Sequence, residues 1–421
     1  MNKDKDAIYS EQKKLVIFSH LSNLHGAVLS LLDTIENLNK DKFNIYVGIP
    51  RWGPIVKRLK DIGIVPFVTY FPPMRYLRIR KKLKTLRSRC NIKITKILYE
   101  FFKTVLAVFR KWCTSRTKRW LLKIQPDIIY INTIIGAEIL RFLKINRGAF
   151  LHKKCRWVWH IREVLSDNSH ILTYKDYFNE FVQTAVNCSD ILIFNSEVSR
   201  DTFLKYVRPE IQGVIREKSH VVYQGFMIPR QKPVSKTDAF FADSINIAVV
   251  GSVTSSKKQD IVIKALLPLK NYHKKINLII FGKKDPAYYR QLRQFVRAYN
   301  LTDNVIFRDY VADLRFCMHK YFSILITPSL MEPFGRVVAE AMLQGLPVVA
   351  VNSGGYKEII QDGVTGFLVE PDRPEDIAAA VKKIIDNPQL AETLTDNAFA
   401  SVSERFNISN YINAIEKLFS C

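Results

Sequence analysis

At 421 residues the chain is too long for one ordinary hydrophobic core, so we expect two domains. A hydrophobic fraction of 48% excludes disorder, and no apolar run approaches the ~20 residues that span a bilayer. The formal net charge of +25 is uneven, because residues 246–421 contain 21 Lys and Arg against 18 Asp and Glu, whereas residues 75–123 contain 17 against one. The six cysteines lack metal-ligand or disulfide-framework spacing, which favours a reducing cytosol.

The first half of the sequence predicts a β/α series. An apolar strand at 14–19 precedes a loop, a helical run at 28–38 and a second strand at 43–49. Further strands are predicted at 127–132, 156–160, 190–195 and 220–223. The first loop contains Gly26, which would let the backbone approach a phosphate, although an ordinary β-α turn has the same composition.

A basic segment interrupts this series at about residues 75–123. From residue 94 to 112 its apolar residues recur at spacings of three and four, which predicts an amphipathic helix. Such helices suit an anionic membrane surface, where each Lys or Arg contributes about 1 kcal/mol. The alternative is that the apolar stripe faces the protein core. Nucleic acid is not the expected partner, because no DNA- or RNA-binding motif accompanies the charge.

The second half predicts another β/α series after a polar, proline-containing linker at 226–245. Its strands are predicted at 245–251, 277–281, 305–307, 324–327 and 347–351. Two such series imply an α/β protein with two Rossmann-like parallel-sheet domains facing a cleft. We expect an N-terminal domain at 1–225, a C-terminal domain at 246–400, and a helix at 401–421 that could pack back on the N-terminal domain.

The most informative element is an E-P-F-G sequence at residues 332–335, followed by a second acid, Glu340. The Pro-Phe-Gly part ends the preceding strand, so Glu332 lies at the carboxyl end of that strand, where ligands bind in open α/β sheets. The first amides of the next helix form a seat for phosphate. Glu340 can accept hydrogen bonds from a vicinal diol such as a ribose. The alternative is two surface acids without a ligand.

This half of the sequence resembles the donor-binding half of a glycosyltransferase family 4 enzyme with the GT-B fold. The E-x7-E element from Glu332 to Glu340 carries the strongest part of the resemblance. Further stretches follow the family's usual order: residues 345–350, 353–355, 358–360 and 362–369. Upstream, Gly251 with Lys257 resembles the loop that grips the donor diphosphate. The N-terminal half matches more loosely.

The resemblance implies transfer of a sugar from a nucleotide sugar with retention of configuration. It implies no metal and no other cofactor, since the nucleotide sugar is a substrate. Glu332 would contact the donor sugar as a catalytic residue, Glu340 would bind the ribose, and Lys257 would neutralise the diphosphate. A fixed cation and a helix N-terminus both stabilise the charge on a departing nucleoside diphosphate. The other implied donor-binding positions are Gly26, Gly251, Ser252, Lys258, Ser329, Phe334, Gly335, Arg336 and Val337.

Two positions depart from the family's pattern. The family often has Arg directly after the loop glycine, where this chain has Ser252. A glycine commonly follows the lysine, where this chain has Lys258. One guanidinium is therefore missing. Lys258 or Arg336 is expected to supply the second positive charge, and the alternative is that Lys258 is only solvated.

A second group of candidates follows a strand of the N-terminal half, in Trp-His-Ile-Arg-Glu at residues 159–163. Family members often have a histidine followed by an acid here. Glu163 is that acid and an acceptor-side candidate, Arg162 stands where histidine is usual, and His160 lies two residues earlier. His160 and Arg162 are candidate catalytic residues that bind the donor or position the acceptor hydroxyl. The alternative is a packed aromatic strand with an incidental histidine.

We therefore predict a glycosyltransferase, cytoplasmic and peripheral on the inner face of the membrane, that extends a lipid-linked or cell-envelope glycan. Its partners would be the nucleotide-sugar donor, the glycan acceptor and an anionic membrane surface. One alternative is a soluble transferase acting on a small sugar or sugar phosphate. Another is a catalytically silent GT-B subunit of a partner transferase, although the intact pair of Glu332 and Glu340 argues against it.

Overall fold

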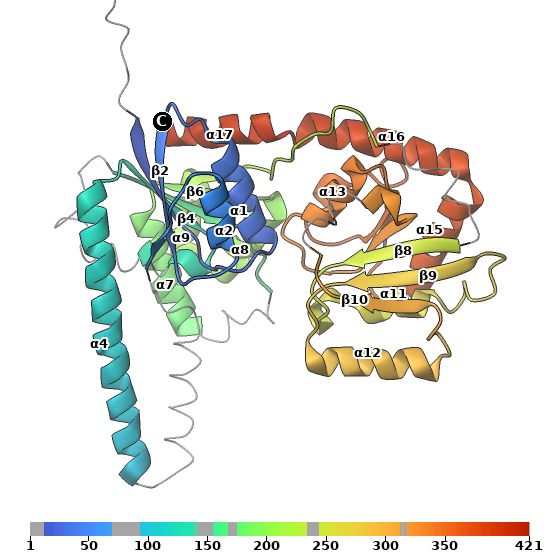
Figure 1. Ribbon diagram of the computed structural model, residues 1–421, viewed down its shortest axis with the longest axis horizontal. Helices are drawn as coiled ribbons and strands as arrows, with labels where there is room; N and C mark the ends of the chain where they lie inside the picture. Colours follow the sequence, from blue (N-terminus) through green and yellow to red (C-terminus); the bar gives the residue numbers. More distant parts are fainter. Residues whose placement is uncertain are drawn as a thin grey trace, which may run out of the picture. The chain divides into compact units, whose positions relative to one another are not determined.

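The computed structural model describes residues 12–69, 93–137, 139–140, 155–166, 175–233, 244–311, 314 and 318–420 (Figure 1). The chain divides into two compact units. The first unit comprises Met1–Phe194, Leu204–Val222 and Ile412–Cys421, and the second comprises Asn195–Phe203 and Tyr223–Tyr411. Residues 75–92 of the basic segment and 234–243 of the expected linker lie outside the described residues.

The first unit is built on a seven-stranded parallel sheet with strand order β3-β2-β1-β4-β5-β6-β7. Its strands are β1 (Lys13–Phe18), β2 (Phe43–Ile49), β3 (Phe67–Val68), β4 (Ile128–Asn132), β5 (Arg156–Ile161), β6 (Ile191–Phe194) and β7 (Ser219–Val221). The accompanying helices are α1 (Gly26–Asn37), α2 (Ile55–Asp61), α4 (Lys93–Ile124), η1 (Ile135–Ala137), α7 (Lys175–Cys188), α8 (Glu197–Tyr206) and α9 (Pro209–Lys218).

The second unit is built on a six-stranded parallel sheet with strand order β10-β9-β8-β11-β12-β13. Its strands are β8 (Ser244–Val250), β9 (Lys275–Phe281), β10 (Val305–Arg308), β11 (Ile324–Thr327), β12 (Val348–Val351) and β13 (Phe367–Val369). The helices are η3 (Ser255–Lys257), α11 (Gln259–Ala265), α12 (Pro286–Ala298), η5 (Met318–Lys320), α13 (Arg336–Leu343), α14 (Tyr356–Ile359), α15 (Pro374–Asp386), α16 (Pro388–Arg405) and α17 (Ile408–Ser420).

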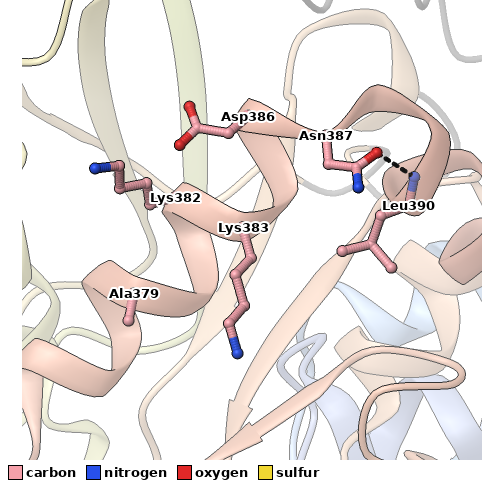
Figure 2. A pocket seen from close by; sticks show the side chains of 6 residues that line it. All are labelled: Ala379, Lys382, Lys383, Asp386, Asn387 and Leu390. Carbon is pink, nitrogen blue, oxygen red and sulfur yellow. Dashed lines mark hydrogen bonds between the residues drawn. The ribbon is translucent and has the colours of Figure 1, made fainter.

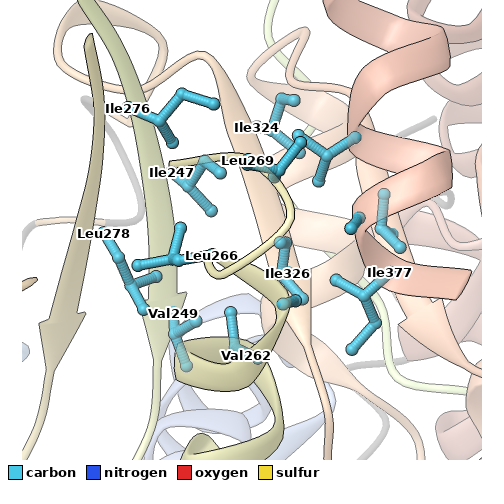
Figure 3. Close-up of a cluster of buried hydrophobic side chains, with 14 of the residues drawn as sticks. Ile247, Val249, Val262, Leu266, Leu269, Ile276, Leu278, Ile324, Ile326 and Ile377 are labelled. Carbon is cyan, nitrogen blue, oxygen red and sulfur yellow. The ribbon is translucent and has the colours of Figure 1, made fainter. Parts of the chain in front are cut away.

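Alternate side chains of the second sheet enter two separate hydrophobic cores. Ile247 and Val249 of β8 pack with Val262 of α11 and Ile377 of α15 on one face (Figure 3). Between them in the sequence, Ala248 belongs to the other core, with α13 and α16. Because both faces of the sheet are covered, its strands read as nearly continuous apolar runs, which is why they could be predicted.

Both sheets have the strand order of the doubly wound fold, so the prediction of two Rossmann-like domains is confirmed. The order reverses between β1 and β4 in the first unit and between β8 and β11 in the second. Ligands of such folds bind at the carboxyl ends of the strands beside this reversal. The fold therefore predicts ligand binding at the loops after β8 and β11, and at those after β1 and β4.

The helix α4 forms most of the described part of the basic segment. Its C-terminal part packs on the first unit, where the Trp120 ring stacks on Phe67 with centroids 4.5 Å apart. Further along the helix, four large apolar side chains are 46–63% exposed and follow one another at spacings of four, three and four residues: Phe101, Val105, Val108 and Trp112. Within the described part of the chain, no helix is both long and apolar enough to cross a bilayer.

The end of α17 completes the core of the first unit. The Phe419 ring contacts Phe43 and Tyr130, with centroids 5.7 and 5.9 Å apart. Glu416 accepts a hydrogen bond from the Asn39 amide (2.8 Å) and pairs with Lys42 (2.9 Å). The last residues of the sequence are therefore part of the same folded unit as its first strands.

The start of α8 belongs to the second unit. The Glu358 carboxylate of α14 accepts hydrogen bonds from the amides of Glu197 (2.9 Å) and Val198 (2.8 Å), which caps the helix. The Ser196 hydroxyl donates to the carbonyl of Pro333. These contacts attach residues 195–203 to α14 and to the loop that carries the E-P-F-G motif.

Candidate active site

The loop between β11 and α13 has a backbone conformation that requires glycine. It enters α13 through Gly335, whose φ of +100° lies in the left-handed region. A Cβ added to Gly335 would lie 2.7 Å from the Tyr356 ring, closer than packed atoms approach. The turn places Glu332 on one side and the first turn of α13 on the other.

The turn after β12 holds this loop by backbone contacts. The Gly355 amide donates to the Glu332 carbonyl (2.8 Å), and the Ser353 hydroxyl donates to the carbonyl of Leu330. A Cβ on Gly354 would lie 2.7 Å from the Glu332 carbonyl oxygen. Only glycine therefore lets the two backbones approach this closely.

Tyr356 supports the loop from the interior. Its hydroxyl forms hydrogen bonds with Thr327, at the end of β11, and with Ser329 in the loop. Burial, together with the charge of Glu332, raises the pKa of Tyr356 well above its usual range, so the group is a neutral hydroxyl. The structure places Ser329, a predicted donor-binding residue, in the interior at 3% exposure.

Glu332 forms an ion pair with Lys257, the cation predicted to meet the donor diphosphate. Lys257 ends η3 after β8 and Glu332 follows β11, so the pair joins the loops of the two strands at which the sheet order reverses. The Lys257 side chain is 31% exposed and that of Glu332 is 23% exposed. A ligand can therefore reach both charges.

The positions that depart from the family's pattern lie in the same loop. Gly251, with φ of +152°, has open space within 4 Å of an added Cβ. The Ser252 carbonyl accepts a hydrogen bond from the side chain of Gln259 (2.9 Å). Lys258 adopts a left-handed φ of +54°, which gives a physical reason for glycine being common here in the family. Its ammonium pairs with Asp372 (3.1 Å).

Arg336 and Glu340 lie one helical turn apart on α13 and form a second ion pair. Arg336 Nε lies 2.8 Å from a Glu340 carboxylate oxygen, and the two side chains are 12% and 11% exposed. The Arg336 guanidinium also covers the Phe226 ring, 5.3 Å from its centroid. These contacts orient the Glu340 carboxylate. Among the three predicted cations, Lys257 is the one paired with Glu332.

The N-terminus of α13 can offer backbone amides. The first intrahelical hydrogen bond joins the Val338 amide to the Gly335 carbonyl (2.9 Å), so the preceding amides have no acceptor within the helix. Val337 is half-buried. The Phe334 side chain is 3% exposed and packs with Phe406, with centroids 5.2 Å apart, so it belongs to the core. Any ligand contact of Phe334 therefore goes through its backbone.

In the first unit, the predicted residues after β5 belong to a buried polar network. His160 has no exposed surface, and its Nδ1 lies 2.5 Å from the Tyr130 hydroxyl. Arg162, 5% exposed, donates to Asn132 Oδ1 (2.7 Å) and to the Tyr130 hydroxyl (3.3 Å). Glu163 accepts hydrogen bonds from the amides of Ile134 and Arg162, both at 3.0 Å. Burial raises the pKa of Glu163, and these amides oppose that shift.

A further group of residues near this network was not predicted from the sequence. His20 follows β1 and is 7% exposed, and its buried Nδ1 has no hydrogen-bond partner among the described residues. Its ring lies 5.6 Å from that of His25, the residue that precedes α1. Gly26 begins α1 with open space around an added Cβ. Asn132 donates to the carbonyl of Ala27 (3.3 Å), which ties β4 to α1.

These histidines make the stability of the first unit depend on pH. Burial, with the charges of His25 and Arg162, lowers the pKa of His20 to about 3. Below pH 6.5 the unfolded chain therefore binds a proton that the folded chain does not, and stability falls as pH falls. For His20 alone we expect a loss of about 2 kcal/mol of unfolding free energy between pH 7 and pH 5.

Urea unfolding followed by tryptophan fluorescence measures this loss, because all five tryptophans lie in the first unit. The variant His20→Gln should lose less stability on acidification than the native chain. The same change at the exposed His220 provides the control and should leave the pH slope unaltered. Equal slopes in His20→Gln and the native chain would contradict the buried, neutral state of His20.

A pocket of about 400 Å³ lies elsewhere on the second unit, between α15 and the start of α16 (Figure 2). It contains none of the predicted site residues. Two of its polar groups already have structural roles: Asp386 accepts a hydrogen bond from the Tyr272 hydroxyl, and Asn387 Oδ1 caps α16 through the Leu390 amide (3.0 Å). This pocket therefore does not compete with the loops after β8 and β11 as the candidate site.

Two doubly wound domains, with an acid pair and a cation at the strand reversal of the second, define a glycosyltransferase of the GT-B type. Residues 233–401 match the family model described as glycosyl transferases group 1. The human alpha-1,3/1,6-mannosyltransferase ALG2 is 30% identical over 302 residues, 66% of this chain and 70% of ALG2. The chain belongs to this family of glycosyltransferases.

Two other proteins extend the comparison. The lipopolysaccharide core biosynthesis mannosyltransferase LpcC of Rhizobium leguminosarum is 27% identical over 177 residues, 41% of this chain and 50% of LpcC. The crystal structure of Anabaena HepE in complex with UDP-glucose has a TM-score of 0.73 and 23% identity, covering 97% of this chain and 99% of HepE. This likeness shows that the GT-B fold extends over nearly the whole chain.

Proposed function

We propose that this glycosyltransferase moves a sugar from a nucleotide-sugar donor to a lipid-linked or cell-envelope glycan at the cytoplasmic face of the membrane, with retention and without a metal. The main support is the ion pair of Glu332 and Lys257 at the strand reversal of the second sheet. Two comparisons add support, since HepE binds UDP-glucose and LpcC acts in lipopolysaccharide core biosynthesis.

In this proposal the second unit holds the nucleotide and the leaving phosphate. Lys257 and the first amides of α13 receive the diphosphate, Glu340, oriented by Arg336, receives the ribose hydroxyls, and Glu332 meets the donor sugar. When the bond from the anomeric carbon to the phosphate oxygen breaks, the electron pair leaves with the nucleoside diphosphate. A cation and dipoles that are already in place stabilise that charge without rearranging.

The residues of the first unit divide into two roles. Arg162 and Glu163, after the carboxyl end of β5, are proposed to act on the acceptor side. His160, a predicted catalytic residue, has no exposed surface. We therefore assign it an indirect role, in which it holds Tyr130 and thereby orients the Arg162 guanidinium.

Nucleotide-sugar turnover in the native chain and in Glu332→Ala tests the catalytic part of the proposal. UDP-, GDP-, dTDP- and ADP-sugars are the donors to screen, with and without EDTA. We expect turnover that persists in EDTA and falls at least 100-fold in Glu332→Ala, as for other residues that act at the transition state. Equal activity in the two chains would remove the role of Glu332, and no turnover would favour a silent GT-B subunit.

The membrane part of the proposal rests on α4. Its exposed apolar side chains, Val105 and Val108 among them, share the helix with nine Lys and Arg and one acid, Glu100. An apolar stripe flanked by positive charge suits the surface of an anionic bilayer, where apolar burial and electrostatic attraction add together.

Flotation with phosphatidylserine-containing vesicles tests this surface. We expect the native chain to float and Val108→Asp to bind at least five-fold more weakly, because the substitution places a charge on the apolar stripe. The matched control is Val364→Asp in the second unit, where the valine is 38% exposed. Binding should also weaken as salt is raised. Failure of the native chain to float would leave the soluble transferase as the better proposal.

A further inference from the structure

The Glu332 carboxylate and a donor phosphate would both bind the same cation, Lys257. The Lys257 ammonium is paired with the Glu332 carboxylate. The proposed function requires the same ammonium to face a diphosphate, which carries more negative charge than a carboxylate. If Glu332 stayed in place, two anions would share one lysine and repel each other at short range.

The other acids of the site have partners of their own. Glu340 pairs with Arg336 from its own helix, at 2.8 Å. Asp372 pairs with Lys258, at 3.1 Å. Glu332 is therefore the acid that pairs with the cation of the phosphate seat. It does so from a loop held by backbone contacts with the turn after β12.

We propose that the Glu332 carboxylate takes the place of a donor phosphate on Lys257 whenever no donor is bound, and that an arriving diphosphate displaces it. This inference rests on the proposed function. Displacement frees the Glu332 carboxylate when the donor binds, so that it can contact the donor sugar. After transfer the sugar is gone, so Glu332 returns to Lys257 and helps to expel the nucleoside diphosphate. Glu332 thus lowers the affinity for the nucleotide, although it is required for turnover.

The test is a binding measurement in which loss of a site residue should improve affinity. UDP and GDP are titrated calorimetrically into the full chain carrying Glu332→Gln, which keeps the shape of the side chain and removes its charge. We expect the nucleotide that binds the native chain to bind this variant roughly two- to five-fold more tightly, the range for removing a partly exposed ion pair. Glu332→Ala should give the same sign if the amide variant folds poorly.

Two controls separate displacement from a general change in charge. Asp386→Asn removes one negative charge beside Tyr272, which precedes the amino end of β9, whereas the site follows the carboxyl ends of β8 and β11. This variant should leave the affinity unchanged. In the Lys257→Ala background, adding Glu332→Gln should bring no gain, because the shared cation is gone. Glu340→Gln should bind more weakly than the native chain, since it loses a ribose contact.

The outcomes distinguish the inference from the function on which it rests. If the native chain binds UDP or GDP and Glu332→Gln binds it equally well or more weakly, displacement is wrong and the proposed function stands. A gain that persists in the Lys257→Ala background would also overturn it. If the native chain binds none of UDP, GDP, dTDP and ADP, both proposals fail together.

Discussion

Replacing Gly335 by alanine should destabilise the second unit and abolish donor binding. The new Cβ would meet two costs, a φ of +100° that alanine rarely adopts and a contact 2.7 Å from the Tyr356 ring. Strain of each kind costs roughly 1–3 kcal/mol, so we expect a loss of about 2–6 kcal/mol in unfolding free energy. Limited proteolysis and thermal unfolding of the full chain measure this loss, and nucleotide titration measures the damage to the site.

A second variant shows which of the two costs is larger, the backbone strain or the contact with the Tyr356 ring. Tyr356→Leu removes most of the ring, so the double variant Gly335→Ala/Tyr356→Leu should be more stable than the two separate losses predict. Simple additivity would mean that backbone strain alone explains the effect. Gly26→Ala is the matched control for a glycine at a helix start, because nothing lies within 4 Å of its added Cβ. Loss of fold in that control would show that such substitutions are damaging in general.

Replacing Lys257 by alanine should lower kcat/KM for the donor by roughly 100-fold, the usual effect of losing one group that stabilises transition-state charge. The reason is the position of its ammonium at the reversal of the strand order, paired with Glu332 and still 31% exposed. The measurement is steady-state turnover with the donor identified by the nucleotide screen. Thermal unfolding of Lys257→Ala should stay close to that of the native chain, because a partly exposed ion pair contributes at most about 1 kcal/mol to stability.

Lys258→Gly is the companion to this variant, since it also removes one positive charge from the loop. Glycine suits the φ of +54° at this position, so the backbone should keep its conformation. We expect turnover within about three-fold of the native rate, because Lys258 already faces the exposed Asp372 and ion pairs of this kind contribute little. A drop as large as that in Lys257→Ala would instead make Lys258 the second cation of the phosphate seat.

Most strands could be predicted because each is a short apolar run between turn residues. The strands β3 and β13 were missed, because runs of two and three residues carry only a weak periodic signal. The division of the chain into units could not be read from composition. Residues 195–203 join the second unit through Ser196 and Glu358, which are far apart in sequence.

The residues of the candidate site were also predicted only in part. Glu332, Gly335 and Glu340 lie within nine residues, so local spacing indicated their arrangement. Tyr356 was missed although it directly follows the Ser-Gly-Gly turn, because its role depends on a ring packed against Gly335. His20 was missed because a single histidine in a polar loop carries no pattern, and its buried, unpartnered nitrogen appears only in three dimensions.

The contact of Phe419 with Phe43 and Tyr130 has a consequence for protein synthesis. Translation adds about 5–20 residues per second, so on the order of 10 to 40 seconds separate the emergence of Val222 from that of Phe419. Throughout that interval the earliest-made sheet lacks one of its packing partners. The segment made later, from Tyr223 to Tyr411, can bury its own cores first. On the ribosome, the second unit should therefore complete its core before the first unit does, although the sheet of the first unit is synthesised earlier.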